Sequence, residues 1–401
     1  MNPTETLKAS RAEDVLGYVP HTLGYWPTNS LVCVTMSKGR LGATLRVDLP
    51  PADISSFQAH SFSARVVDYL LSDERADGVL IAIYPPALLG PSWQPCMELL
   101  ESLECAVEGE GLVLRDAWVI GTDLWRNSYC QNHECCPPQG RSLEDIRNSP
   151  LSAELIYRGS ALGAAPGING QSADELSIQT GPFGRLSPQQ AAAVLPEENR
   201  LREQLLHGPR GGASAEALLA QWEPFLSGEN RCEVSASDAA ALRAGLSVPL
   251  FRDTIMVQAA GGLALALDGV QEITRCEPLD VAAADQRDSA QETVDHYAEF
   301  LMGQSPAGPN WKRMDTFAEL LGALLFDGPG GHKAPVLAVL GWIEWCRGRG
   351  SMAGAHLDAA LGHNPDYRLA ELLSELIARG HLSNWARNRA TAWHGIQEDS
   401  A

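Results

Sequence analysis

One short segment of this chain concentrates side chains that bind metals or react with oxidants. Cys130, His133, Cys135 and Cys136 fall within seven residues, and two prolines and a glycine follow them, which predicts a turn. Three of the nine cysteines of the chain lie in this segment. Three thiolates and one imidazole are a common tetrahedral ligand set for zinc. The segment therefore predicts a metal site formed by these four residues, with zinc as the candidate ion.

The spacing of these ligands weakens the zinc interpretation. It reads C-x2-H-x-C-C, which differs from the paired C-x2-C of zinc fingers and ribbons. The vicinal cysteines are expected to reach one ion only with a strained backbone. A second ligand cluster is missing from the sequence, because Cys232, Cys276 and Cys346 are isolated.

Two alternatives use the same cysteines. In one, Cys130 forms a reversible disulfide with Cys135 or Cys136, and the nearby Arg126 or Arg141 favours a reactive thiolate. In the other, the cysteines pack as small buried hydrophobic side chains that shape a turn. The sequence alone favours this last interpretation, because buried cysteine is common in folded proteins.

Six further residues are candidates for binding a small ligand. They are Trp125, Ser128, Tyr129 and Arg141 around the cysteines, and Arg46 and Asp48 in a predicted strand. Side chains two residues apart in a strand share one face of the sheet. Arg46 and Asp48 can therefore hold an anionic or hydrogen-bonding ligand together, or form a salt bridge with each other. The salt bridge is the favoured interpretation.

The elements that would position these residues alternate in type through the first part of the chain. Runs rich in apolar and β-branched residues predict strands over 30–36, 41–47, 79–84 and 112–120, and helical spacing of apolar residues predicts helices over 53–72 and 94–108. This order predicts an α/β domain over residues 1–160, with a mixed, partly parallel sheet. The cysteine-rich loop over 125–141 is expected to follow the last of these strands.

The remainder of the chain is predicted to be helical. Residues 161–186 are rich in small residues and are expected to form a linker or loop, followed by an all-helical domain over 187–395. The run Ser187-Pro-Gln-Gln190 is typical of a helix start, with serine as the cap and glutamine in a capping box.

The last helices of this domain fit one 34-residue tetratricopeptide frame. Counted from Ala334, the frame positions are occupied by Leu340, Gly341, Ala353, Leu357, Ala360 and Pro365. One repeat cannot bury its own face, so the frame predicts a tetratricopeptide-like helical hairpin inside a bundle. The same segment, 334–380, is the candidate surface for a protein partner, although helix packing alone is the favoured explanation.

Composition excludes several classes of function. The chain has 30 basic and 50 acidic residues among 401, a formal net charge of −20, which argues against binding nucleic acid or an anionic membrane. No secretory signal or long apolar run is visible, so a cytoplasmic location is expected, where cysteines are thiols or metal ligands.

The motifs G-x-S-x-G, H-E-x-x-H and G-x-G-x-x-G after a strand are missing. Whether the protein is an enzyme stays open.

Several segments together resemble an actinobacterial family catalogued as a domain of unknown function (family 4192). The residues that carry the resemblance are 19–32 (VPHTLGYWPTNSLV), 45–50 (LRVDLP), the cysteine segment with Gly140 and Arg141, 152–159 (SAELIYRG), 342–345 (WIEW) and 364–370 (NPDYRLA). The resemblance covers nearly the whole chain and is loosest over 161–235. It implies a bacterial, cytoplasmic protein, and it supplies no catalytic residue.

Two functions follow as hypotheses. The first is an α/β protein that binds a small ligand or a metal at the cysteine-rich loop. The second is an interaction or scaffold protein that acts through its helical domain.

Overall fold

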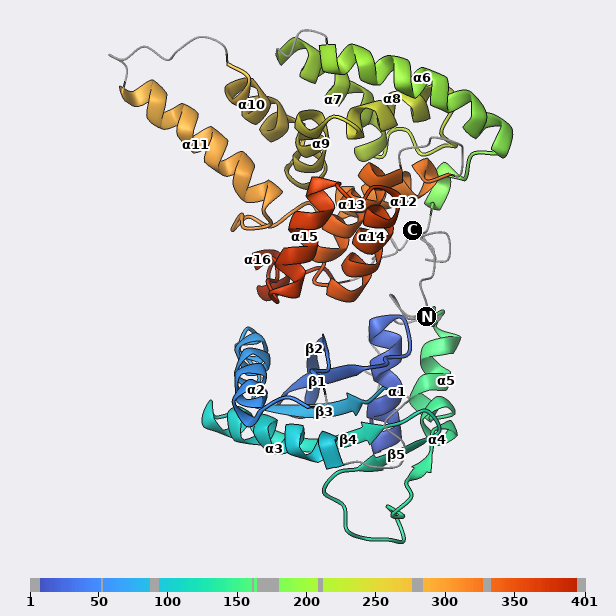
Figure 1. Ribbon diagram of the computed structural model, residues 1–401, viewed down its shortest axis with the longest axis vertical. Helices are drawn as coiled ribbons and strands as arrows, with labels where there is room; N and C mark the ends of the chain where they lie inside the picture. The colour runs from blue at the N-terminus through green and yellow to red at the C-terminus, as the bar shows by residue number, and fades with distance from the viewer. Residues whose placement is uncertain are drawn as a thin grey trace. The chain divides into compact units, whose positions relative to one another are not determined.

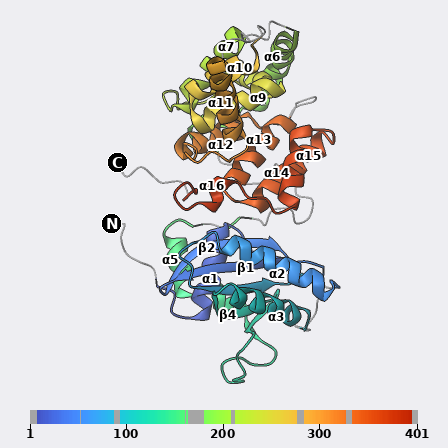
Figure 2. The ribbon, with the colours of Figure 1, turned by 90° about the vertical axis from the view of Figure 1, so that its left-hand side faces the viewer.

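The computed structural model describes residues 8–51, 53–86, 94–160, 162–163, 180–207, 212–275, 284–326 and 333–394. The chain divides into two compact units, Met1–Ala165 and Pro166–Ala401 (Figures 1 and 2). Most of the linker expected over 161–186, and the isolated Cys276, lie outside the described residues. Within the described residues, no helix has both the length and the apolar character needed to cross a bilayer.

The first unit is built on one mixed sheet of six strands. The strands are β1 (Ser30–Ser37), β2 (Arg40–Asp48), β3 (Gly78–Tyr84), β4 (Val113–Ile120), β5 (Leu124–Asn127) and β6 (Arg141–Ser142). Their order across the sheet is β2-β1-β3-β4-β5-β6, and only β3 and β4 run parallel. The mixed sheet predicted from the sequence is therefore confirmed. The cysteine-rich loop was expected to follow the last strand, but it instead connects β5 to β6. The sequence did not predict these two strands, because they are too short to show a periodic pattern.

Helices cover both faces of this sheet. They are α1 (Ala12–Leu23), α2 (Ser56–Leu70), α3 (Gln94–Gly109), α4 (Glu144–Arg147) and α5 (Pro150–Tyr157). One core forms between the sheet and α2 and α3, and a second forms on the opposite face with α1 and α4 (Figure 1). The sequence predicted no helix before residue 53; α1 contains Pro20, a residue that normally interrupts a helix. The unit is a three-layer α/β/α structure.

The second unit is helical, and no strand occurs among its described residues. Its helices are the short 3-10 helix η3 (Gly181–Phe183), α6 (Pro188–His207), α7 (Gly212–Leu226), α8 (Ala236–Leu246), α9 (Pro249–Gly261), α10 (Leu263–Ile273), α11 (Ala284–Leu301), α12 (Trp311–Leu324), α13 (Lys333–Cys346), α14 (Gly350–His363), α15 (Arg368–Ala378) and α16 (Asn384–Arg387). The predicted capping box is present at α6. The Ser187 amide donates to Gln190 Oε1 over 2.9 Å, and the Gln190 amide donates to Ser187 Oγ over 3.3 Å.

Helix α13 is central to this unit. All of its residues are buried, and it packs against α12, α14 and α15 (Figure 1). A Cβ atom built on Gly341 would lie 2.7 Å from a methyl carbon of Leu357 on α14, so only glycine allows this close approach. Ala353 and Ala360 are fully buried as well. The predicted pair of closely packed helices is thus present.

Candidate metal centre

Residues 128–140 form a long loop that extends away from the body of the first unit (Figures 1 and 2). Its start is fixed by Asn127, the last residue of β5. Asn127 Oδ1 accepts the backbone N–H groups of Tyr129 and Cys130, both over 2.9 Å. Asn127 Nδ2 donates to Asp116 Oδ1 on β4 over 2.6 Å. Through these bonds one asparagine ties the first cysteine to the sheet, in the manner of an Asx turn.

The other end of the loop is fixed by a tight turn before β6. The Gly140 amide donates to the Pro137 carbonyl over 2.8 Å, and Gly140 has a φ of +97°. A Cβ atom at this position would lie 3.0 Å from the carbonyl oxygen of Trp125. The left-handed backbone and the close approach both require glycine. The Trp125 side chain is buried, and its indole N–H donates to the Ser142 carbonyl over 3.1 Å.

The middle of the loop folds back on itself at Asn132. The Cys136 amide donates to the Asn132 carbonyl over 2.8 Å, and the Glu134 amide donates to Asn132 Oδ1 over 2.9 Å. This turn brings the vicinal pair Cys135 and Cys136 back towards Cys130. Neither vicinal cysteine has a positive φ.

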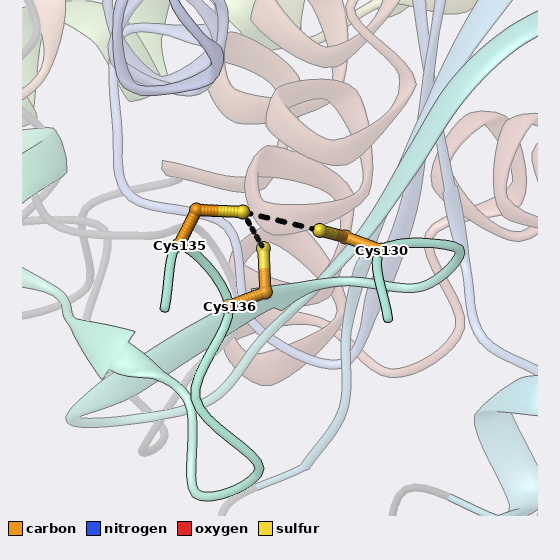
Figure 3. A group of neighbouring side chains, drawn as sticks. All are labelled: Cys130, Cys135 and Cys136. Carbon is orange, nitrogen blue, oxygen red and sulfur yellow. Dashed lines mark hydrogen bonds between the residues drawn. The ribbon is translucent and has the colours of Figure 1, made fainter. Parts of the chain in front are cut away.

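The three sulfur atoms converge on one point (Figure 3). Cys130 Sγ lies 3.3 Å from Cys135 Sγ, which in turn lies 3.8 Å from Cys136 Sγ. All three lie within 4.8 Å of one another. Two thiolates on a tetrahedral zinc ion with 2.3 Å bonds are separated by about 3.8 Å. The separations of 3.3 and 3.8 Å are close to this value, so the three sulfurs could hold one metal ion.

His133 does not join this group. Its side chain is exposed, and among the described residues the cluster that could hold an ion consists of the three cysteine sulfurs. The structure therefore brings together three of the four expected ligands. A zinc ion with three protein ligands retains one open position, as in catalytic zinc sites.

The three thiols differ in environment. Cys136 is 8% exposed, and burial raises the pKa of its thiol to about 12. Cys130 is half-buried, and hydrogen bonds with the Cys135 and Cys136 thiols lower its pKa. Cys135 is exposed. The expectation that the cysteines pack as buried hydrophobic side chains therefore holds for Cys136 and not for the other two.

The aromatic and basic residues around the loop have structural partners. The Arg141 guanidinium pairs with Glu13 on α1 over 2.5 Å and with Asp145 over 3.2 Å, and it stacks 5.0 Å above the Trp125 ring. The Tyr129 hydroxyl donates to Glu104 on α3 over 3.0 Å. Arg141 and Tyr129 thus attach the loop ends to neighbouring helices.

Ser128 differs from these neighbours. Its amide donates to the Ala117 carbonyl over 2.9 Å, which extends the pairing of β5 with β4 by one residue. Its hydroxyl oxygen is buried and forms no hydrogen bond with the described residues. Ser128 therefore contributes its backbone to the base of the loop.

Arg46 and Asp48 lie elsewhere in the unit. Arg46 forms an ion pair of 2.7 Å with Asp48 and donates from Nε to Ser30 Oγ over 2.8 Å, so the favoured salt bridge is present. Both residues belong to β2, at the opposite edge of the sheet from β5 and β6. The structure does not bring them to the cysteine loop.

Sequence reasoning found the three cysteines and missed the two asparagines that arrange them. Asn127 and Asn132 each accept a backbone N–H group two residues further along the chain. An asparagine before a turn favours this contact, and this was the available signal.

Comparison with known protein families supplies one match. A family model described as a domain of unknown function (DUF4192) matches residues 13–285 and 307–382, which include the whole cysteine loop. No curated protein and no solved structure matches the chain.

Proposed function

The chain belongs to the DUF4192 family of domains of unknown function, and from this premise we propose that it binds a thiophilic metal ion, Zn²⁺ in the first instance, through Cys130, Cys135 and Cys136. The observation that supports this proposal is the convergence of three sulfur atoms within 4.8 Å. The backbone turns at Asn127 and Asn132 produce this convergence. Thiolates select soft or borderline ions such as Zn²⁺ and Cu⁺ over Mg²⁺ and Ca²⁺.

Each ligand has a distinct place in the proposed site. Cys136 is the interior ligand, since its side chain is only 8% exposed. Cys130 and Cys135 are the outer ligands and leave the ion accessible from solvent. The fourth position falls to a water molecule or to His133, which is exposed in the same loop. The cytoplasmic location expected from the sequence would keep all three thiols reduced.

Metal analysis of the untagged, full-length protein tests the proposal. After reduction and exposure to ZnCl2 followed by desalting, we expect one zinc ion per chain, with Cys130, Cys135 and Cys136 protected from an alkylating reagent. Cys130→Ser or Cys135→Ser should abolish stoichiometric zinc. Cys232→Ser removes an exposed thiol from the helical unit and should leave the zinc content unchanged. Zinc-free protein in which the three loop thiols alkylate freely would refute the proposal.

The small-ligand hypothesis stays a prediction. Trp125, Tyr129 and Arg141 are engaged in contacts that hold the loop, and Arg46 is engaged with Asp48. We therefore restrict the proposed site to the thiols.

We retain a second proposal for the helical unit. In it, α13 and α14 form a tetratricopeptide-like hairpin, and residues 334–380 bind a protein partner. Because α13 is wholly buried, the contact would fall to α14 and α15, where Leu372 is 42% exposed. Replacing Leu372 with aspartate should abolish capture of a partner without unfolding the protein, and an unchanged set of captured proteins would contradict this role.

A further inference from the structure

We propose that Cys130 and Cys135 form a reversible disulfide bond, and that this oxidation disassembles the metal site. The first part concerns the two thiols alone and applies to metal-free protein. The second part, the loss of metal, rests on the proposed zinc binding.

Geometry favours Cys130 and Cys135 over the vicinal pair Cys135 and Cys136. Their sulfur atoms are 3.3 Å apart, whereas those of Cys135 and Cys136 are 3.8 Å apart (Figure 3). Successive Cα atoms across a trans peptide are about 3.8 Å apart, which is shorter than the roughly 4.4–6.8 Å that disulfides span. A bond between the vicinal cysteines would therefore distort the chain. Cys130 and Cys135 are separated by a turn and meet no such obstacle.

Accessibility selects the same pair. Cys135 is exposed and Cys130 is half-buried, while Cys136 is 8% exposed. The Asn132 carbonyl lies 3.6 Å from Cys135 Sγ and 4.0 Å from Cys130 Sγ, so the two thiols converge over the same turn. A dissolved oxidant can reach these two sulfurs from solvent. The closed ring would lie within the loop and outside the sheet.

The oxidant that we assign is a low-molecular-mass disulfide, of which glutathione disulfide is the test compound. The thiolate of one cysteine attacks a glutathione sulfur, breaks its S–S bond and releases one glutathione thiolate. The thiolate of the other cysteine then attacks the protein sulfur of this mixed disulfide and releases a second glutathione. The protein loses two protons and two electrons, and glutathione disulfide is reduced to two thiols.

The same reaction removes two of the three proposed metal ligands. A disulfide sulfur carries no negative charge, so a zinc ion would retain Cys136 as its single thiolate. One ligand cannot hold zinc against water at ordinary concentrations, because structural sites require several. Oxidation and zinc binding therefore exclude each other.

Peptide mapping tests the disulfide on metal-free, full-length protein. After incubation with glutathione disulfide and blocking of free thiols, we expect a linked Cys130–Cys135 peptide that dithiothreitol cleaves. Cys136→Ser should form the same link. Cys130→Ser and Cys135→Ser should each stop with one glutathione attached to the remaining partner. A Cys135–Cys136 or Cys130–Cys136 link, or no link at all, would overturn the proposal.

Zinc titration of the two redox forms tests the second part. We expect reduced protein to bind one zinc ion and the mapped disulfide form to bind none. Full zinc binding by the disulfide form would overturn the coupling. If the reduced form also binds no zinc while the disulfide still forms, the proposed zinc binding and its coupling to oxidation are both refuted. The proposed disulfide between Cys130 and Cys135 is then supported on its own.

Discussion

The two units of the chain place their reactive and charged side chains in opposite ways. In the helical unit, the Arg243 guanidinium and the Glu198 carboxylate are each 1% exposed and lie 2.7 Å apart. In the α/β unit, the loop thiols contact one another, and those of Cys130 and Cys135 are not buried. The buried ion pair has a structural role, because removing either partner would leave the other charge buried without an opposite charge. The Cys130 and Cys135 thiols have no such explanation, since Asn127, Asn132 and Gly140 shape the loop through hydrogen bonds that involve no thiol. This difference favours a function for the thiols.

Breaking the buried ion pair should have the largest effect on stability. Arg243→Met would leave the Glu198 carboxylate buried without its partner and would remove the bond of 2.7 Å from Arg243 to the Leu324 carbonyl. We expect the free energy of unfolding of the helical unit to fall by about 3–5 kcal/mol. Urea unfolding followed by circular dichroism measures this change.

Two further variants serve as controls for this measurement. Arg243→Met combined with Glu198→Leu removes both charges, and much of the lost stability should return. Arg379→Ala breaks an exposed pair with Glu375 and should change stability by less than about 1 kcal/mol. An equal effect of Arg243→Met and Arg379→Ala would contradict the structural role assigned to the buried pair.

The buried His356 should make the helical unit sensitive to acid. It is 4% exposed, and burial lowers its pKa to about 4, while Glu344 raises the pKa and Arg349 and Arg347 lower it further. In the unfolded chain histidine has a pKa of about 6.5. Between these values the unfolded state binds a proton that the folded state does not. Stability is therefore full above about pH 6.5 and declines as the pH falls towards 4, by about 3 kcal/mol at most.

Unfolding experiments at several pH values check this sign. His356→Gln removes the titrating group, so its stability should decline less between pH 6.5 and 4 than that of the unmodified protein. Zinc binding plays no part in this measurement, which is made on metal-free protein. Parallel pH profiles of the two proteins would show that His356 is not the source of the acid sensitivity.

The packing of α13 against α14 predicts a smaller effect. Gly341→Ala would place a methyl group 2.7 Å from the Leu357 side chain and 3.3 Å from the Ala353 carbonyl. We expect a loss of about 1–3 kcal/mol in thermal or urea unfolding. Gly354 on α14 has open space around its Cα, so Gly354→Ala should instead stabilise the unit by about 0.5–1 kcal/mol. The same sign for both variants would argue against the close helix contact.

The sequence predicted the regular elements better than it predicted the loop. The strand expected over 79–84 is found as β3 (Gly78–Tyr84), because a continuous apolar run marks a strand covered on both faces. Helix α1 and the strands β5 and β6 were missed, since a proline interrupts the first and the other two are short. Periodicity detects an element only when enough residues repeat it.

The site was predictable in its residue types and not in its geometry. The cysteines were visible in the sequence, and so was the doubt about their vicinal spacing. Which thiol is buried depends on hydrogen bonds of Asn127 and Asn132 with the backbone, and such bonds leave no repeating pattern. His133 matched the zinc ligand types but faces solvent, because a loop position does not fix the direction of its side chain.

Substitutions in the cysteine loop, where the proposed metal site lies, should have the smallest effect on the free energy of unfolding. Cys135 is exposed on the loop, so in metal-free protein Cys135→Ser should change the free energy of unfolding by less than about 0.5 kcal/mol. Cys33→Ser is the matched control in the core of the same unit, where Cys33 is 1% exposed. Its new hydroxyl would be buried at a loss of about 1–3 kcal/mol.

Added zinc should then distinguish the loop variant Cys135→Ser from the core variant Cys33→Ser. At a free zinc concentration about one hundred times the dissociation constant, the unmodified protein should gain about 2.7 kcal/mol. Cys33→Ser should gain the same amount, since its loop is intact, whereas Cys135→Ser should gain nothing. If zinc stabilises Cys135→Ser as much as the unmodified protein, the ion binds elsewhere, and the exposed thiols lose the role that distinguishes them from the buried charges of the helical unit.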